Sequence, residues 1–309
     1  MRRRPGETRN EGEPQQGSKT AAEVRQEKAP GIGPGQKSSL IATFVQPDGK
    51  ILTTEGAGHG KIMWRDLAVT SSVVTVNKKG VISLRHDPRA TAGKLPHVSI
   101  TVPSHPDLHA DLDIPLRYDY AFKTNFSGST GASGMNGSDG QDGSPGSVGS
   151  MDPDNPSPGG DGGNGTDGSN GQDGSPGGDA PAVQIQMAVE AGPHALVQFG
   201  VFAAGHKRYY LVDPNGGSLS VNADGGQGGS GGRGGRGGHG GIGGSGSPSG
   251  SNGRDGSDGQ NGMDGSAGRG GSITVTYDPQ AAPFLSLLHL SNSNGPKPVF
   301  QEQPVAPLW

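Results

Sequence analysis

Residues 128–149 read GSTGASGMNGSDGQDGSPGSVG, in which every third residue is glycine. Three further stretches keep the same period, at 159–178, 225–244 and 250–271. We call these four stretches tracts 1 to 4, in chain order. A period of three fits neither an α-helix nor a β-strand, and it is typical of the left-handed polyproline-II geometry with three residues per turn. The tracts therefore predict four extended, glycine-rich helices of the polyglycine-II type.

The composition sets these tracts apart from the rest of the chain. Of the 60 glycines among 309 residues, 42 lie within 128–178 and 225–271, so the remaining chain uses glycine at an ordinary rate. Cysteine is absent, which excludes a disulfide scaffold and a cysteine-ligated zinc. The net charge of −4 is too small to indicate a nucleic-acid partner. No apolar run is long enough for a membrane span, and none resembles a signal-peptide core.

The arrangement of the tracts favours one folded chain over a collagen triple helix. A collagen-like composition needs roughly 15–20% proline, whereas the periodic tracts contain only Pro145 and Pro176. The tracts have matched lengths, which antiparallel hairpins require. The breaks between them, at 150–158 and 245–249, are then the tips of two hairpins. We expect these tips to contact a partner, and the candidate residues are Met151, Asp152, Asp154, Asn155, Ser247 and Pro248.

The non-glycine positions of the tracts fall into columns. Tracts 1, 2 and 4 each carry one column rich in Asn and Asp, which we expect to face water; whether these columns bind calcium is left open. Tract 3 reads Gly-Gly-X, so two of its edges carry no side chain, and we expect it to lie centrally in the bundle. Its third column carries Arg233, Arg236 and His239, which we expect to face carboxylates of neighbouring tracts.

The rest of the sequence predicts β-structure. Short alternating apolar runs between turns over 38–126 favour an antiparallel β-sandwich. Similar runs over 181–224 and 273–290 predict a β base, at 127–290, from which two glycine-rich hairpins project. Residues 1–37 are polar and are expected to be disordered. Residues 291–309 hold several prolines and predict an extended tail.

Two resemblances follow from these residues. The periodic tracts, with the run Gly-Gly-Arg-Gly-Gly-Arg-Gly-Gly at 231–238, resemble the glycine-rich domain of Obg-type GTPases, springtail glycine-rich antifreeze proteins and glycine-rich tail-fibre adhesins of phages. No GTPase domain follows the tracts, and the cysteines of the antifreeze type are missing. Trp64, SSVVTVN at 71–77, GVIS at 80–83 and ITV at 100–102 resemble bacterial Ig-like group 2 domains. That resemblance implies a spacer or adhesive unit of a surface protein, although residues 86–97 are longer and more polar than in that pattern.

One segment carries metal-ligand types at regular spacing. Alternation places His105, Asp107, His109, Asp111 and Asp113 on one face of a strand. The outer face of a half-buried strand explains the same pattern. Side chains on that face are also about 7 Å apart along the strand, which is too far for shared ligation without other segments. We therefore expect no metal and no cofactor.

These observations favour a non-enzymatic structural or adhesive protein of all-β fold with polyglycine-II helices. A protein or glycan surface is the expected partner, at a bacterial cell surface or fibre. One alternative is binding to ice or another crystal surface through a flat face of the bundle. Another is an intracellular, Obg-like assembly factor, which would place the protein in the cytoplasm.

Overall fold

The computed structural model describes residues 21–28, 30–190, 192 and 194–309. The chain divides into two units, residues 1–120 and 121–309. Helix is confined, in the described residues, to four 3₁₀ segments, and everything else regular is β-strand. The all-β expectation is confirmed. The 3₁₀ segments are η1 (Gly56–Gly58), η2 (Trp64–Asp66), η3 (Pro88–Ala90) and η4 (Pro279–Leu287).

The first unit holds two sheets whose named strands all pair antiparallel. One has the order β1-β2-β6-β5, with β3 also on β2, and the other has the order β4-β7-β8. Both sheets contribute to one buried cluster around Trp64, Ile82 and Ile100. The strands are β1 (Ala21–Gln26), β2 (Lys37–Val45), β3 (Ile51–Thr53), β4 (Ala68–Ser72), β5 (Thr75–Val76), β6 (Val81–Ser83), β7 (His97–Val102) and β8 (His105–Asp113).

Strand β1 corrects the expectation of disorder over 1–37. Residues 21–26 pair along their whole length with β2, although the segment 1–37 around them is polar. Val24 is buried in the core, and Gln26 is buried with its amide bonded in both directions to the backbone of Gly31. A single apolar anchor and a satisfied amide thus hold a strand that composition alone does not reveal. The remainder of the expectation, at 1–20, lies outside the described residues.

The second unit begins at Ala121, before the predicted boundary at 126, because β9 pairs with β13 rather than with a strand of the first unit. Its five-stranded sheet has the order β12-β11-β10-β14-β16, and its three-stranded sheet has the order β15-β13-β9. The two sheets share a core around Phe199, Leu219 and Val275. The strands are β9 (Ala121–Asn125), β10 (Val183–Glu190), β11 (Leu196–Ala203), β12 (His206–Val212), β13 (Ser218–Asn222), β14 (Ile273–Tyr277), β15 (Leu288–Ser291) and β16 (Val299–Glu302).

The predicted tail over 291–309 is partly regular structure. Residues 299–302 form β16, which pairs in parallel with β14. Beyond it, the backbone N–H of Leu308 donates to Oε1 of Gln198 at 2.8 Å. The ring of Trp309 meets that of Tyr209 edge-on, with centroids 5.9 Å apart. The end of the chain is therefore held against the five-stranded sheet.

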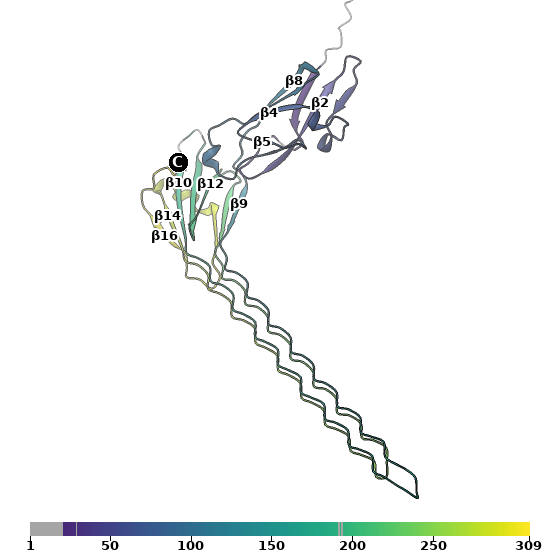
Figure 1. Cartoon of the computed structure of the whole chain (residues 1–309). Helices are drawn as coiled ribbons and strands as arrows, with labels where there is room; N and C mark the ends of the chain where they lie inside the picture. Colours follow the sequence, from purple (N-terminus) through teal and green to yellow (C-terminus); the bar gives the residue numbers. More distant parts are fainter. Residues whose placement is uncertain (1–20, 29, 191, 193) are drawn as a thin grey trace, which may run out of the picture. The chain divides into compact units, whose positions relative to one another are not determined.

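The tracts connect strands of the second unit (Figure 1). Tract 1 follows β9, and tract 2 leads into β10; tract 3 follows β13, and tract 4 leads into β14. Their backbones are joined sideways by hydrogen bonds that recur every third residue. Representative N–H to O distances at one level of the bundle are 2.9 Å for Ser169 to Ser138, 2.9 Å for Gly235 to Ser169, 2.8 Å for Gly259 to Gly235, 2.7 Å for Gly137 to Arg233 and 2.9 Å for Gly168 to Ser257.

These bonds define which tracts are neighbours. Tracts 2 and 3 each bond to all three other tracts, whereas tracts 1 and 4 bond only to tracts 2 and 3. Tract 3 carries buried glycines at every third position, among them Gly232, Gly235 and Gly238, which agrees with its expected central place. Tract 2 is equally connected, although only one of its columns is entirely glycine. Within each hairpin the two tracts run antiparallel, as their matched lengths predict.

The pairing of the strands continues into the tracts. Asn125 of β9 pairs with Asn222 of β13, and Asn136 of tract 1 bonds to Arg233 of tract 3 across the same separation of 97 residues. Strands β10 and β14 pair in parallel, and tracts 2 and 4 are bonded in parallel, both at a separation of 90 residues. The paired strands and the tracts that adjoin them therefore share one register.

Candidate functional site

The Asn and Asp columns have a structural role that the sequence analysis did not assign to them. Their side chains are exposed to solvent, as expected, and Oδ1 of most of them also accepts a backbone N–H from the neighbouring tract. Oδ1 of Asp139, for example, lies 2.8 Å from the backbone nitrogen of Arg236. Only an oxygen acceptor is needed, which explains why Asn and Asp alternate freely in these columns.

Four pairs of tracts border a groove on the outside of the bundle: 1 and 2, 1 and 3, 2 and 4, and 3 and 4. Three of these four grooves are closed in this way. Tract 1 closes its groove with tract 3 through Asn136, Asp139 and Asp142. Tract 4 closes its groove with tract 3 through Asn252, Asp255, Asp258, Asn261 and Asp264. Tract 2 closes its groove with tract 4 through Asp161, Asn164, Asp167, Asn170 and Asp173. Asp179, directly after tract 2, continues the series by accepting the N–H of Arg269.

The groove between tracts 1 and 2 differs from the other three. Here the hydroxyl oxygens of Thr166 and Ser169 accept the N–H groups of Gln141 and Ser138, both at 2.7 Å. The two columns that flank this groove contain no charged residue. They are Ser129, Ala132, Met135, Ser138, Gln141, Ser144 and Ser147 on tract 1, and Gly160, Gly163, Thr166, Ser169, Gln172, Ser175 and Gly178 on tract 2.

Tract 3, which carries the cationic column, lies beside tracts 1 and 4, and both of these carry an acidic column. Arg233, Arg236 and His239 are all exposed. His239 Nδ1 lies 3.8 Å from Oδ1 of Asp255. Neither guanidinium lies within 4.0 Å of a carboxylate of the described residues, and the carboxylate beside Arg236 accepts its backbone N–H instead. Contact between these cations and the neighbouring carboxylates is thus made chiefly through the main chain.

The two tips meet at the end of the bundle. The backbone N–H of Ser247 donates to the carbonyl of Ser157 at 3.0 Å, and that of Gly159 donates to the carbonyl of Pro248 at 3.0 Å. The longer tip is closed internally, because Ser157 Oγ accepts the N–H of Ser150 at 2.7 Å. The six residues singled out from the sequence therefore lie in two tips that are bonded to each other at the end of the bundle.

The side chains at this end are open to solvent. Every residue from 151 to 158 and from 247 to 249 is exposed, and Met151 keeps 66% of its surface accessible. Oδ1 of Asp152 accepts the N–H of Asp154 at 3.0 Å, which orders the turn between them. The tips thus combine an ordered backbone with an apolar side chain, two carboxylates and an amide that face outward.

Strand β8 shows the expected alternation, with His105, Asp107, His109, Asp111 and Asp113 exposed. Nδ1 of His97 on β7 lies 2.8 Å from Oδ1 of Asp113, and Nε2 lies 3.3 Å from Oδ1 of Asp111. The hydrogen bond to Asp113, with the charges of both carboxylates, raises the pKa of His97. The imidazole therefore acts as a bridge between two carboxylates, and the described residues contain no cluster of three His, Asp or Glu side chains suited to a metal ion.

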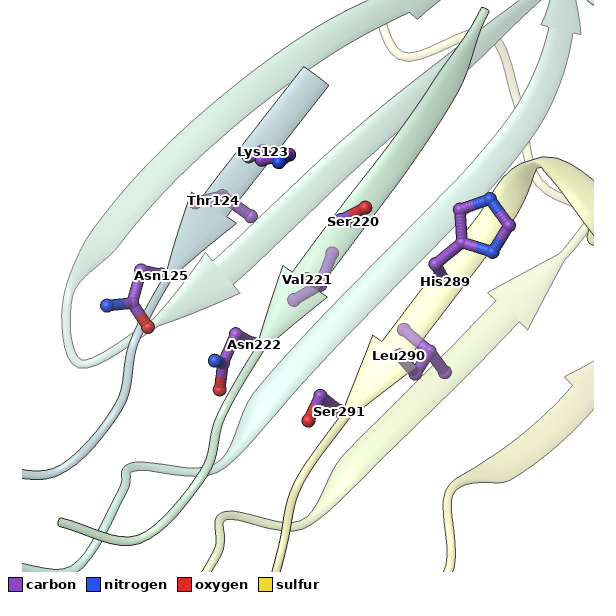
Figure 2. Close-up of a pocket in the computed structure, with 9 residues that line it drawn as sticks. All are labelled: Lys123, Thr124, Asn125, Ser220, Val221, Asn222, His289, Leu290 and Ser291. Atoms are coloured by element: carbon purple, nitrogen blue, oxygen red, sulfur yellow. The ribbon is translucent and has the colours of Figure 1, made fainter. Parts of the chain in front are cut away.

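A hollow of about 460 Å³ lies over the three-stranded sheet at the base of the tracts. Three residues from each of β9, β13 and β15 line it: Lys123, Thr124, Asn125, Ser220, Val221, Asn222, His289, Leu290 and Ser291 (Figure 2). Sequence reasoning missed this site. The sequence shows the alternating polar residues within each strand. It does not predict that three strands so far apart in the sequence align side by side.

Comparisons with known proteins found no matching family model, no similar curated protein and no similar solved structure. In the part of the chain that the structure describes, no helix has the length and apolar character needed to span a membrane.

Proposed function

We propose that this chain is a non-enzymatic structural or adhesive protein. In this proposal the four tracts form a polyglycine-II bundle on a β base, the first unit is a β-sandwich, and the two tips contact a protein or glycan surface. The observation that carries the proposal is the meeting of the two tips, exposed and mutually bonded, at the end of a laterally bonded bundle.

The pattern of hydrogen bonds supports the polyglycine-II assignment. Such helices have no internal hydrogen bonds and must satisfy their backbone groups through neighbours. In the tracts the bonds are lateral and recur every third residue. With a rise of about 3.1 Å per residue, a tract of this length extends for roughly 60–70 Å. Such a bundle holds its tips well away from the base without needing a large apolar core.

The resemblance of the tracts to phage tail-fibre adhesins supports an adhesive role and a location at a cell surface or fibre. Rigid scaffolds that end in exposed loops commonly bind through those loops. The opposing charges on neighbouring columns also suit a bundle that stays soluble while projecting into solvent.

The tips can be tested with a variant that keeps their length and backbone. Met151, Asp154 and Asn155 are replaced by serine, and Asp152 by asparagine, which keeps an oxygen to accept the N–H of Asp154. A control variant replaces the exposed Gln260 and Met263 on the side of tract 4. We expect the tip variant to lose adhesion of the labelled full chain to source cells and to a glycan array, and the control to retain it. Equal adhesion by both variants would rule out the tips as the contact site.

The uncharged groove between tracts 1 and 2 favours a second candidate, binding to ice or another crystal surface. Such binding needs a flat face of small, regularly spaced side chains, and this face is the one without charge. The test is thermal hysteresis of the full chain, compared with Ser138→Lys and Ser144→Lys in that face. Absence of hysteresis in the unmodified chain would eliminate this candidate.

A further inference from the structure

We propose that the hollow over β9, β13 and β15 binds the acidic group, a carboxylate or a sulfate, of a saccharide. This site is separate from the tips, because it lies at the base of the tracts, where β9 and β13 lead into tracts 1 and 3.

The parallel register builds the hollow from two rows of polar residues. Lys123, Ser220 and His289 form one row, and Asn125, Asn222 and Ser291 form the next. Alternation turns Val221 and Thr124 to the core, where they are almost completely buried. The small side chain of Ser220 on the central strand lies between the longer side chains of Lys123 and His289, and this difference in size leaves the space open (Figure 2).

Hydrogen bonds within the chain fix the amides so that their nitrogens remain available. Oδ1 of Asn222 accepts the backbone N–H of Asp224 at 2.7 Å, and Oδ1 of Asn125 accepts that of Ser127 at 3.0 Å. A backbone N–H can only donate, so the atom facing it must be the amide oxygen. The two amide NH₂ groups have no protein acceptor among the described residues and are free to donate to a ligand.

The hollow carries one ammonium group, that of Lys123, and its lining residue Ser291 is bonded to the ionised carboxylate of Asp224. Lys123 and His289 form no ion pair with any carboxylate of the described residues. The nearby carboxylate of Asp224 is already engaged, because its Oδ1 accepts the N–H of Ser293 and the hydroxyl of Ser291. The N–H of Ser293 and the hydroxyl of Ser291 lower the pKa of Asp224, so it stays ionised without needing a cation.

The size of the hollow is compatible with a ligand larger than a free ion. Its volume lies within the range of about 300–1,000 Å³ that is typical of small-molecule sites, and it exceeds what one inorganic oxyanion fills. Ammonium, imidazole and amide donors suit a carboxylate or sulfate. The hydroxyl of Ser220 suits a hydroxyl group of a sugar, and the hydroxyl oxygen of Ser291, which donates its proton to Asp224, can accept from another. An acidic saccharide carries both an anionic group and hydroxyl groups.

The experiment uses the full chain and calorimetric titration with oligogalacturonate, a neutral glucose oligomer of equal length, and inorganic sulfate. We expect the acidic oligomer to bind, the neutral oligomer to bind at least tenfold more weakly, and added salt to weaken the acidic complex. Lys123→Gln and His289→Gln should each lower the affinity about tenfold, while the exposed Lys297→Gln, outside the hollow, should leave it unchanged.

Ser220→Phe is a second variant, which fills the hollow from its exposed face without changing the core. It should abolish binding while leaving the thermal melt unchanged. The proposal is overturned if the acidic oligomer does not bind, or if Lys123→Gln and Lys297→Gln behave alike. Sulfate binding as tightly as the oligomer would overturn the saccharide as the source of the anion.

Discussion

Glycine in the tracts permits close approach between backbones. None of the described tract glycines has a dihedral angle φ in the left-handed region, so an unusual backbone conformation is not the reason for its presence. A Cβ atom built on Gly235 would lie 2.0 Å from the carbonyl oxygen of Ser138, and one on Gly259 would lie 2.0 Å from that of Ser169. Side chains are therefore excluded from these edges, because the neighbouring atoms belong to the main chain and cannot move aside by a change of rotamer.

We accordingly expect Gly235→Ala to destabilise the second unit by about 1–3 kcal/mol, the usual cost of an overpacked interior. The control is Arg236→Ala in the same triplet, whose side chain is exposed and should change stability little. Urea denaturation followed by circular dichroism measures both. Equal midpoints for the two variants would contradict the packing described for tract 3.

His97 in the first unit makes stability depend on pH. Its pKa is raised in the folded chain, first by the hydrogen bond to Asp113. The stability that this interaction contributes is therefore present below the unfolded pKa of about 6.5 and is lost as the pH rises through the folded pKa. We expect His97→Gln to lower the melting temperature at pH 5.5 and to have little effect at pH 9. A difference of the same size at both pH values would exclude this linkage.

Each tract makes its backbone hydrogen bonds to neighbouring tracts. The register of one tract therefore depends on the register of all the tracts to which it bonds. Tract 2 bonds to tracts 1, 3 and 4 at every turn. Removing one triplet keeps the period of a tract but displaces everything beyond the cut relative to three partners. The Asn and Asp side chains that close the grooves would then face the wrong level.

We expect deletion of 168–170 from tract 2 alone to lower the melting temperature markedly. Matched deletion of 137–139, 168–170, 234–236 and 257–259, which lie at one level, should leave the melting temperature near that of the unmodified chain. The bundle should also shorten by about 9 Å, three residues at about 3.1 Å each. Circular dichroism and small-angle scattering measure the two effects. Similar melts for the single and the matched deletion would show that the tracts are not in register.

The sequence predicts the elements far better than their alignment. The period of three indicates the tracts, their breaks indicate the tips, and the Gly-Gly-X pattern indicates the central place of tract 3. The parallel pairing of β9 with β13 could not be predicted, because it joins segments 97 residues apart and no local signal encodes it. The hollow depends on that pairing and on β15, so it was not visible either. Strand β1 was missed because it is short and lies within the polar segment 1–37.

The second unit is one continuous network of backbone bonds from sheets to tips. The sheets share an apolar core, and the tracts, which lack one, extend the same parallel pairs of strands. All four tracts belong to one chain, so their association is intramolecular. A collagen triple helix, in contrast, would need three chains.

The melting temperature should therefore be independent of protein concentration over a range of about 1–100 µM, since only an intermolecular assembly gains stability from mass action. A thermal melt monitored at several concentrations, with sedimentation analysis of the folded state, provides the measurement. A midpoint that rises with concentration would instead indicate that the tracts pair between chains.

The fixed separations of 97 and 90 residues also restrict how this protein can evolve. A gene usually lengthens or shortens a loop by one local insertion or deletion, and most folds tolerate it. Here such an event in one tract would misalign it with the two or three tracts to which it bonds, so selection would remove it. The length of the bundle can change without separating the two tips only if each of the four tracts gains or loses the same number of triplets. Descendants should therefore vary in the exposed residues that close no groove, while keeping the lengths of their tracts tied together.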